Sequence, residues 1–228
     1  MIQNKEIEEI LDRGSFFPYN SSIAKIMLVR AGKKNLHISH TKLHRLLWIL
    51  EVAHIALLDK ELLNEPFQAW TAGPIHPYLF LYISTVCPNL KAGNIDLVSL
   101  CQKETLFKNI PVKQSLNQDS LAIMDRVISV YGKEENSTLF HLLTKEDNCF
   151  SQPWKICRDK RYLNPIPSFL IRKQVNEPDE KLKELVKPFV EPTTHTESAR
   201  SSSLTSSLHA GWKKFVKKCK GNSPREKQ

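Results

Sequence analysis

The densest cluster of hydrophobic positions in the chain lies between His40 and Asp59. A helix drawn over this segment carries apolar side chains on almost every face. A helix that is apolar all round is buried inside a protein rather than laid on its surface. Ser39, directly before it, is a residue type that caps helix N-termini. The pattern therefore predicts a long central helix wrapped by other elements.

Shorter stretches with apolar residues three and four positions apart predict further helices around the central one. Each stretch is bounded by a capping residue, a glycine or a proline. Together they predict a mainly α fold, a compact helical domain built around a buried central helix. The expected helices run from Lys5 to Arg13, from Ser21 or Ser22 to Gly32, from Pro74 or Pro77 to about Cys87, from Asn117 or Asp119 to Gly132, from Ser137 to about Leu143, from Ser151 onward, and from Pro178 to Val186.

One part of the chain departs from helical periodicity and leaves room for a small β element. Residues Pro66 to Thr71 favour an extended strand, and Gly73-Pro74 is a turn signal. The segment Ile95–Pro111 is ambiguous. In one interpretation it holds one or two short strands that pair with Gln68–Trp70.

Charge is unevenly distributed over the 228 residues. The chain has 33 Lys and Arg against 24 Asp and Glu, a formal net charge of +9, and 13 of the basic and 7 of the acidic residues lie from Ile166 onward. Most of the basicity therefore belongs to the C-terminal part. We expect an N-terminal helix in residues 1–15, a compact domain in 16–165, and a charged linker with a basic amphipathic tail in 166–228.

Cysteine usage and the start of the chain indicate a cytoplasmic protein. The five cysteines are odd in number and no pair has C-x-x-C spacing, which argues against a disulfide framework and against a zinc ribbon. The first residues are polar, so we expect no signal peptide. The longest apolar run, Leu46–Leu58, is too short to span a membrane and contains Glu51 and His54.

No pattern in the chain indicates an enzyme. Neither G-x-G-x-x-G nor the P-loop pattern occurs, and the acids of Glu146-Asp147 are adjacent and point apart on a helix. His37, His40 and His44 raise the question of a metal site, because His40 and His44 lie one helical turn apart. Thr41 stands where an H-E-x-x-H motif has glutamate, so we interpret these as surface or capping histidines. We assign no catalytic residue, no cofactor and no metal ligand.

Four short motifs occur in an order that is more specific than any one of them. Together they resemble the Panacea family, the domain of SocA-like antitoxins in bacterial and phage toxin–antitoxin systems. The resemblance covers about residues 21–159, and it departs from the family pattern at Ala72, where Tyr is common, and at Lys145, where His is common. The motifs are Lys42-Leu43-His44-Arg45-Leu46-Leu47-Trp48, Ala69-Trp70-Thr71-Ala72-Gly73-Pro74-Ile75, Tyr131-Gly132, and Leu139–Thr144 followed by Pro153-Trp154.

The resemblance implies an antitoxin that neutralises a cognate toxin by direct protein–protein binding. In some relatives such a protein delivers its toxin to a protease. The resemblance also implies a partner-binding role for motif residues and their neighbours. These residues are Lys42, Arg45, Trp48, Trp70, Gly73, Pro74, His76, Tyr78 and Trp154.

Trp70 and the turn that follows it admit two roles. An indole suits core anchoring and a binding hot spot alike, and we expect core anchoring for Trp70 because large aromatic residues are highly buried on average. Gly73 before Pro74 predicts a backbone position that a bulkier residue would crowd. His76 and Tyr78, just beyond the turn, are expected to form an exposed rim.

The C-terminal tail combines apolar and basic residues at helical spacing. An anionic membrane surface, a nucleic acid and a protein groove are all compatible with it, as is a solvated tail without a partner. The alternative functions are a nucleic-acid-binding regulator and a host- or membrane-directed protein on a Panacea-like scaffold. The sequence does not indicate the oligomeric state. The tail residues expected to make contacts are Trp212, Lys213, Lys214, Phe215, Lys217 and Lys218.

Overall fold

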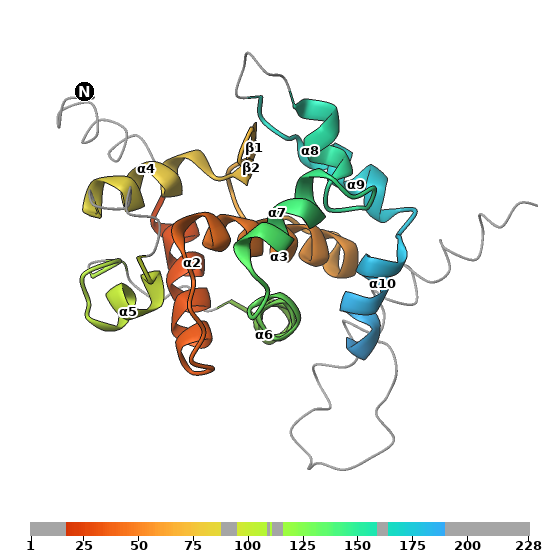
Figure 1. Cartoon of the computed structure of the whole chain (residues 1–228). Coiled ribbons are helices and arrows are strands. Elements are labelled where there is room, and N and C mark those ends of the chain that lie inside the picture. Colours follow the sequence, from red (N-terminus) through yellow and green to blue (C-terminus); the bar gives the residue numbers. More distant parts are fainter. Residues whose placement is uncertain (1–16, 88–94, 109, 111–115, 159–163, 190–228) are drawn as a thin grey trace, which may run out of the picture.

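The computed structural model of the chain describes residues 17–87, 95–108, 110, 116–158 and 164–189. Over these residues the fold is mainly α-helical with one two-stranded sheet, as predicted (Figure 1). The elements in chain order are α2 (Phe17–Gly32), α3 (His40–Leu58), β1 (Gln68–Trp70), β2 (Gly73–Ile75), α4 (Pro77–Val86), α5 (Leu97–Gln102), α6 (Gln118–Tyr131), α7 (Asn136–Thr144), α8 (Gln152–Cys157), α9 (Ser168–Val175), α10 (Glu180–Val186) and the short 3-10 helix η2 (Lys187–Phe189).

Helix α3 is the centre of the molecule, which confirms the prediction of a buried central helix. Sixteen of its nineteen residues are buried, and α6, α7, α9 and α10 all pack against it (Figure 1). The Ser39 side chain accepts a hydrogen bond from the Lys42 N–H and caps its start. The helix ends at Asp59, which adopts the left-handed conformation with φ of 55°.

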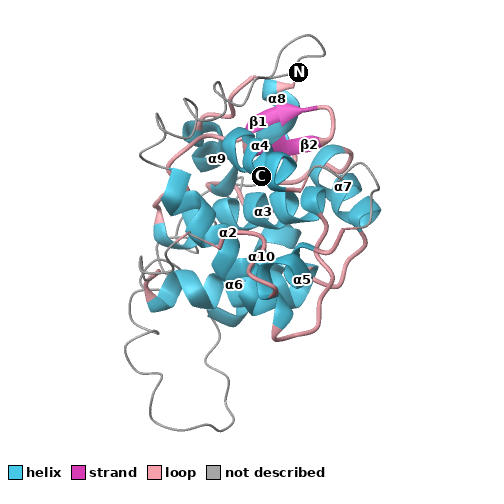
Figure 2. Cartoon of the chain, turned by 90° about the vertical axis from the view of Figure 1, so that its left-hand side faces the viewer, coloured by secondary structure: helices cyan, strands magenta, loops and turns pink. Residues whose placement is uncertain are grey.

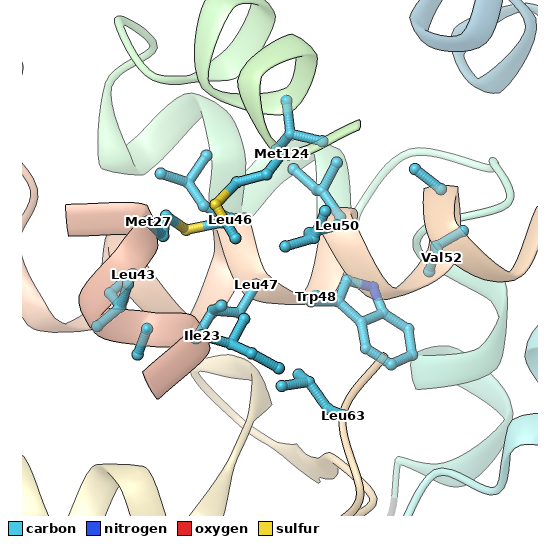
Figure 3. Packing of buried hydrophobic residues seen from close by; sticks show 14 of the residues in the cluster. Ile23, Met27, Leu43, Leu46, Leu47, Trp48, Leu50, Val52, Leu63 and Met124 are labelled. Atoms are coloured by element: carbon cyan, nitrogen blue, oxygen red, sulfur yellow. The ribbon is translucent and has the colours of Figure 1, made fainter. Parts of the chain in front are cut away.

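The hydrophobic core surrounds Trp48, which is fully buried (Figure 3). Its ring meets Phe67 edge-on at 5.1 Å, and its indole N–H donates to the Phe150 carbonyl at 2.8 Å. Met27 of α2 and Met124 of α6 approach α3 from other sides (Figure 3). A buried aromatic ring removes a large apolar area from water, and here its N–H also has a hydrogen-bond partner, so Trp48 stabilises the core.

The small β element is a hairpin of two neighbouring strands, and it does not pair with the described part of residues 95–111. Strands β1 and β2 are antiparallel, with Trp70 opposite Gly73 (Figure 2). On its other side Gln68 forms an isolated bridge with Pro165. The suggested strands in 95–111 are wrong where the structure describes them, because α5 occupies part of that segment.

Gly73 has a backbone conformation that requires glycine. Its φ is +109°, a region that residues with a side chain rarely adopt. Beyond its two chain neighbours, a Cβ there would meet only Thr144, at an ordinary 3.8 Å. Crowding by the following Pro74 stays a prediction. At Gly132, by contrast, a Cβ would lie 2.3 Å from the Ile128 carbonyl oxygen.

Most predicted helix boundaries agree with the structure, and two do not. The predicted starts at Ser39, Asn117 and Ser151 are confirmed. Helix α2 begins at Phe17 rather than at Ser21 or Ser22, and α7 begins at Asn136 with Glu135 before it. Both serines of α2 are buried within the helix.

The packed body continues past the expected domain boundary at residue 165. Helices α9 and α10 lie against α3, and their inward side chains, including Ile171 and Leu182, belong to the common core. The expected helix in 178–186 corresponds to α10. The expected N-terminal helix and basic tail lie outside the described residues. Within the described part, no helix is long and apolar enough to cross a membrane.

Candidate protein-interaction surface

Lys42 joins the start of α3 to the turn that follows α6. Its ammonium group donates to the Gly132 carbonyl at 2.8 Å and to the His37 carbonyl at 3.4 Å. The side chain is buried, and burial lowers the pKa of the Lys42 ammonium while nearby Glu134 opposes that shift. This lysine therefore stabilises the packing of two helices and presents little surface to a partner.

Arg45 joins α3 to the hairpin turn and to the start of α7. Its guanidinium donates to the Ala72 carbonyl at 3.1 Å and to both the carbonyl and the side-chain oxygen of Asn136. It lies over the Phe140 ring at 5.1 Å, and burial lowers the pKa of Arg45 to about 10. Its hydrogen-bond acceptors are amide oxygens, so Arg45 fastens the hairpin turn and the start of α7 to α3.

Two tryptophans make further hydrogen bonds around the hairpin. The Trp48 indole holds the loop before α8 through Phe150. The Trp154 indole donates to the Trp70 carbonyl at 2.9 Å and so ties α8 to β1. Trp154 is almost fully buried. The expected partner residues Trp48 and Trp154 are placed by the structure in the core that supports the hairpin.

His76 is buried, so the expectation of an exposed histidine at this position is wrong. Only 1% of its surface is exposed, and its ring caps α4 by accepting from the Leu79 N–H. Its Nε2 lies 3.0 Å from the Asn20 amide and 3.2 Å from the Glu65 carboxylate. Burial lowers the pKa of His76 to about 4. Both ring nitrogens of His76 therefore have hydrogen-bond partners, which allows a polar side chain to be buried here.

His40 and His44 are also buried, which corrects the expectation of surface histidines. His40 stacks on Phe80 with ring centroids 4.6 Å apart, and His44 Nδ1 accepts from the His76 backbone N–H. Burial lowers the pKa of His40 to about 4 and that of His44 well below its usual value. Among the residues that the structure describes, no three His, Cys, Asp or Glu side chains are grouped to hold a metal ion.

The hairpin turn and the outer side of α4 form the exposed part of this region. Trp70 is partly buried, its ring lies 4.9 Å from Phe80 of α4, and its indole N–H donates to the Gln68 side chain. Thr71 is exposed, and Tyr78 is 40% exposed, which confirms the expectation for Tyr78. We call the area formed by Trp70, Thr71, Tyr78 and Leu81 the hairpin–α4 surface.

Helix α4, like α5 and α7, contains no Asp, Glu, Lys or Arg. Leu79 and Ile83 are buried, whereas Tyr78, Leu81 and Thr85 share the opposite side and are partly or fully exposed. A helix at the edge of a molecule commonly carries charge on its solvent side. Figure 1 shows α4 at the edge, next to the hairpin.

The strongly shifted acid and thiol groups serve the fold. Burial raises the pKa of Glu51 to about 8, and its carboxyl group accepts from the Leu62 and Leu63 N–H groups. Burial raises the pKa of the Cys149 thiol to about 12, which makes it a poor nucleophile at neutral pH. Sequence reasoning gave Glu51 no role, although an acid inside an apolar helix was a visible signal.

Comparisons with protein families, with curated proteins and with solved structures found no match. The resemblance to the Panacea family therefore stays a prediction. It is carried by the four motifs alone.

Proposed function

We propose that the chain is an antitoxin that neutralises a cognate toxin by direct contact through the hairpin–α4 surface. It performs no chemistry of its own. The order of the four motifs supports the class of function. The observation that carries the choice of surface is α4, a charge-free and partly exposed helix beside an aromatic hairpin.

The side chains at this surface suit a protein partner. Tyrosine and tryptophan are the residue types most enriched in binding hot spots, because they bury a large area and keep one polar atom. The Trp70 ring is held by Phe80 and by the Gln68 side chain. A side chain held in this way loses little conformational entropy when a partner binds.

The buried motif residues act indirectly in this proposal. Lys42, Arg45 and Trp154 fix the hairpin and its neighbouring loops to α3 through hydrogen bonds to backbone carbonyls. They stabilise the shape that is offered to the toxin without touching it. The toxin is neutralised when the hairpin–α4 surface covers its active site or holds it in an inactive shape. Delivery of the bound toxin to a protease is a further step that such a complex permits.

A growth experiment with a matched control tests the proposal. A neighbouring gene is expressed alone, then with the wild-type chain, and the pair is purified by pull-down. Tyr78→Glu places a charge on the hairpin–α4 surface. Val29→Glu places the same charge on α2 at a site of nearly equal exposure, 43% against 40%.

The expected result is growth arrest by the neighbour, relief by the wild-type chain and by Val29→Glu, and loss of both relief and binding with Tyr78→Glu. A toxic neighbour that the wild-type chain neither binds nor relieves contradicts the proposed function for that pair. Full relief by Tyr78→Glu contradicts the choice of surface. Circular dichroism of both variants establishes that they are folded.

A further inference from the structure

The positive charge of the chain begins at α8. Residues 1–151 contain sixteen basic and sixteen acidic residues, whereas residues 152–175, which include α8 and α9, contain six basic residues and one acidic residue. A local excess of this kind attracts a negatively charged partner and rejects a positively charged one.

Helices α8 and α9 contact each other (Figure 1). Each exposes one large apolar side chain. Ile156 on α8 is 54% exposed and Phe169 on α9 is 64% exposed. Among the large hydrophobic residues that the structure describes, these two have the greatest exposure. Exposed apolar side chains gathered on adjoining elements are typical of binding surfaces.

The cations of these helices fall into two groups. Lys155 pairs with Asp147, and Arg172 reaches Asp59 and Glu61. Arg158 and Lys173 have no ion pair within the described ranges, and both are exposed. These two are therefore available to a partner's carboxylates.

Arg158 and Lys173 lie close in the sequence to the exposed apolar residues. Arg158 follows Ile156 by two residues, and its guanidinium lies over the Trp154 ring at 5.0 Å. Lys173 is one helical turn beyond Phe169 on α9. A guanidinium supported by a ring keeps its donors directed at solvent, where they match the two oxygens of a carboxylate.

We propose that the α8–α9 surface, formed by Ile156, Arg158, Phe169 and Lys173, binds an acidic amphipathic segment of a partner protein. The partner's carboxylates pair with Arg158 and Lys173. Its apolar side chains cover Ile156 and Phe169. This surface shares no residue with the hairpin–α4 surface, although α8 contacts β1. The inference does not depend on the proposed antitoxin function.

A protein segment fits the α8–α9 surface better than a membrane or a nucleic acid. Binding in a membrane interface needs a continuous apolar helix face, but α8 and α9 have six and eight residues and bury their inner sides in the core. Single-stranded nucleic acid binds by stacking successive bases on aromatic rings, and this surface offers one exposed ring, Phe169, beside the aliphatic Ile156. An acidic segment with interspersed leucine or phenylalanine matches both the charges and the apolar side chains.

Fluorescence anisotropy with a synthetic probe tests the inference on the full chain. The probe is a labelled peptide of about fourteen residues with Glu at most positions and Leu or Phe at helical spacing. Its twin carries Gln in place of every Glu. Arg158→Glu with Lys173→Glu reverses the two available charges, and Phe169→Ala removes the larger apolar contact.

A control variant makes the same change in net charge elsewhere. Lys103→Glu with Lys108→Glu alters two exposed lysines next to α5. We expect the acidic peptide to bind about tenfold more weakly to the double charge reversal, about threefold more weakly to Phe169→Ala, and within about twofold of wild type to the control. The Gln twin is expected to bind at least about tenfold more weakly than the acidic peptide.

Several outcomes would overturn the inference. Equal weakening by the control variant would mean that only the overall charge attracts the peptide. Equal binding of the Gln twin would remove the role of the carboxylates. Displacement of the peptide by phosphatidylglycerol vesicles or single-stranded RNA, with the same dependence on Arg158 and Lys173, would assign the surface to a membrane or a nucleic acid. Failure of Tyr78→Glu in the growth experiment with intact peptide binding would affect the hairpin–α4 surface alone.

Discussion

Arg45 in α3 and Arg158 at the end of α8 show two opposite uses of the same residue type. Arg45 is buried, and its donors bond to carbonyl and amide oxygens that belong to the hairpin turn and to α7. Arg158 is exposed and lies over the Trp154 ring. Each guanidinium lies over an aromatic ring, Phe140 for Arg45 and Trp154 for Arg158, yet the first holds the fold together and the second faces solvent.

In the proposed function, most motif residues support the fold and most contact residues lie outside the motifs. Trp70 and Thr71 are the exceptions, because they belong both to a motif and to the hairpin–α4 surface. The Lys42–Trp48 motif is occupied with internal hydrogen bonds and packing. The exposed residues of the two proposed surfaces, such as Tyr78, Ile156 and Phe169, lie mostly outside the motifs. A family of binding proteins can keep such a framework and change its partner by changing the exposed side chains.

The largest expected loss of stability follows a substitution among the buried motif residues. Trp48→Ala removes a fully buried indole and its hydrogen bond to Phe150, so we expect the free energy of unfolding to fall by about 3–5 kcal/mol. Tyr78→Ala, at a partly exposed site, should change it by less than about 1 kcal/mol. Urea denaturation followed by circular dichroism measures both. A loss of less than about 1 kcal/mol of unfolding free energy for Trp48→Ala would contradict the central role of α3 in stability.

Substitution of Arg45 and of Arg158, each by methionine, compares the contribution of a buried and an exposed arginine to stability. Arg45→Met leaves the carbonyls of Ala72 and Asn136 without their donor, which should cost about 2–3 kcal/mol of unfolding free energy. Arg158→Met should cost less than about 0.5 kcal/mol because Arg158 is exposed. Equal costs, measured by urea denaturation at one pH, would mean that the two arginines are not used differently.

Glu51 extends the comparison to an acid buried in α3. Its pKa is about 8 in the folded chain against an ordinary value of 4.5, so the folded state holds the proton more tightly than the unfolded state. The stability that this group contributes is complete below pH 4.5 and is lost as pH rises through 8. Relative to wild type, Glu51→Gln should therefore gain about 2 kcal/mol between pH 5 and pH 6.5. A constant difference over that range would contradict the raised pKa.

The smallest loss of stability is expected for the hydrogen bond that joins Trp154 of α8 to the Trp70 carbonyl of the hairpin. Trp154→Phe keeps most of the ring but loses the hydrogen bond to the Trp70 carbonyl, at a cost of about 1 kcal/mol. Amide hydrogen exchange should become faster in β1 and β2 and stay unchanged in α6. Uniformly faster exchange would mean that Trp154 supports the whole core rather than the hairpin.

Much of the helical framework follows from the sequence because the relevant signals are local. The apolar pattern and Ser39 were sufficient for α3, and Asn117 was sufficient for the start of α6. The mainly α class follows from the same periodicity. These features depend on residues within one or two turns of each other.

The candidate site was less predictable because its residues are brought together over long distances. The burial of His76 depends on Asn20 and Glu65, and the hairpin's outer bridge depends on Pro165. No local sequence pattern distinguishes a buried histidine that caps a helix from an exposed histidine. The role of Arg45 likewise depends on Asn136, 91 positions away in the sequence.

Hydrogen exchange with and without the toxin tests the central claim most directly. The chain is purified alone and in complex with the toxic product of the neighbouring gene, and amide exchange is compared segment by segment. The account predicts a stable complex in which protection increases in β1, the turn at Thr71 and α4. A stable complex with no added protection in those segments, or the absence of any complex with a toxin that the chain neutralises, would contradict it.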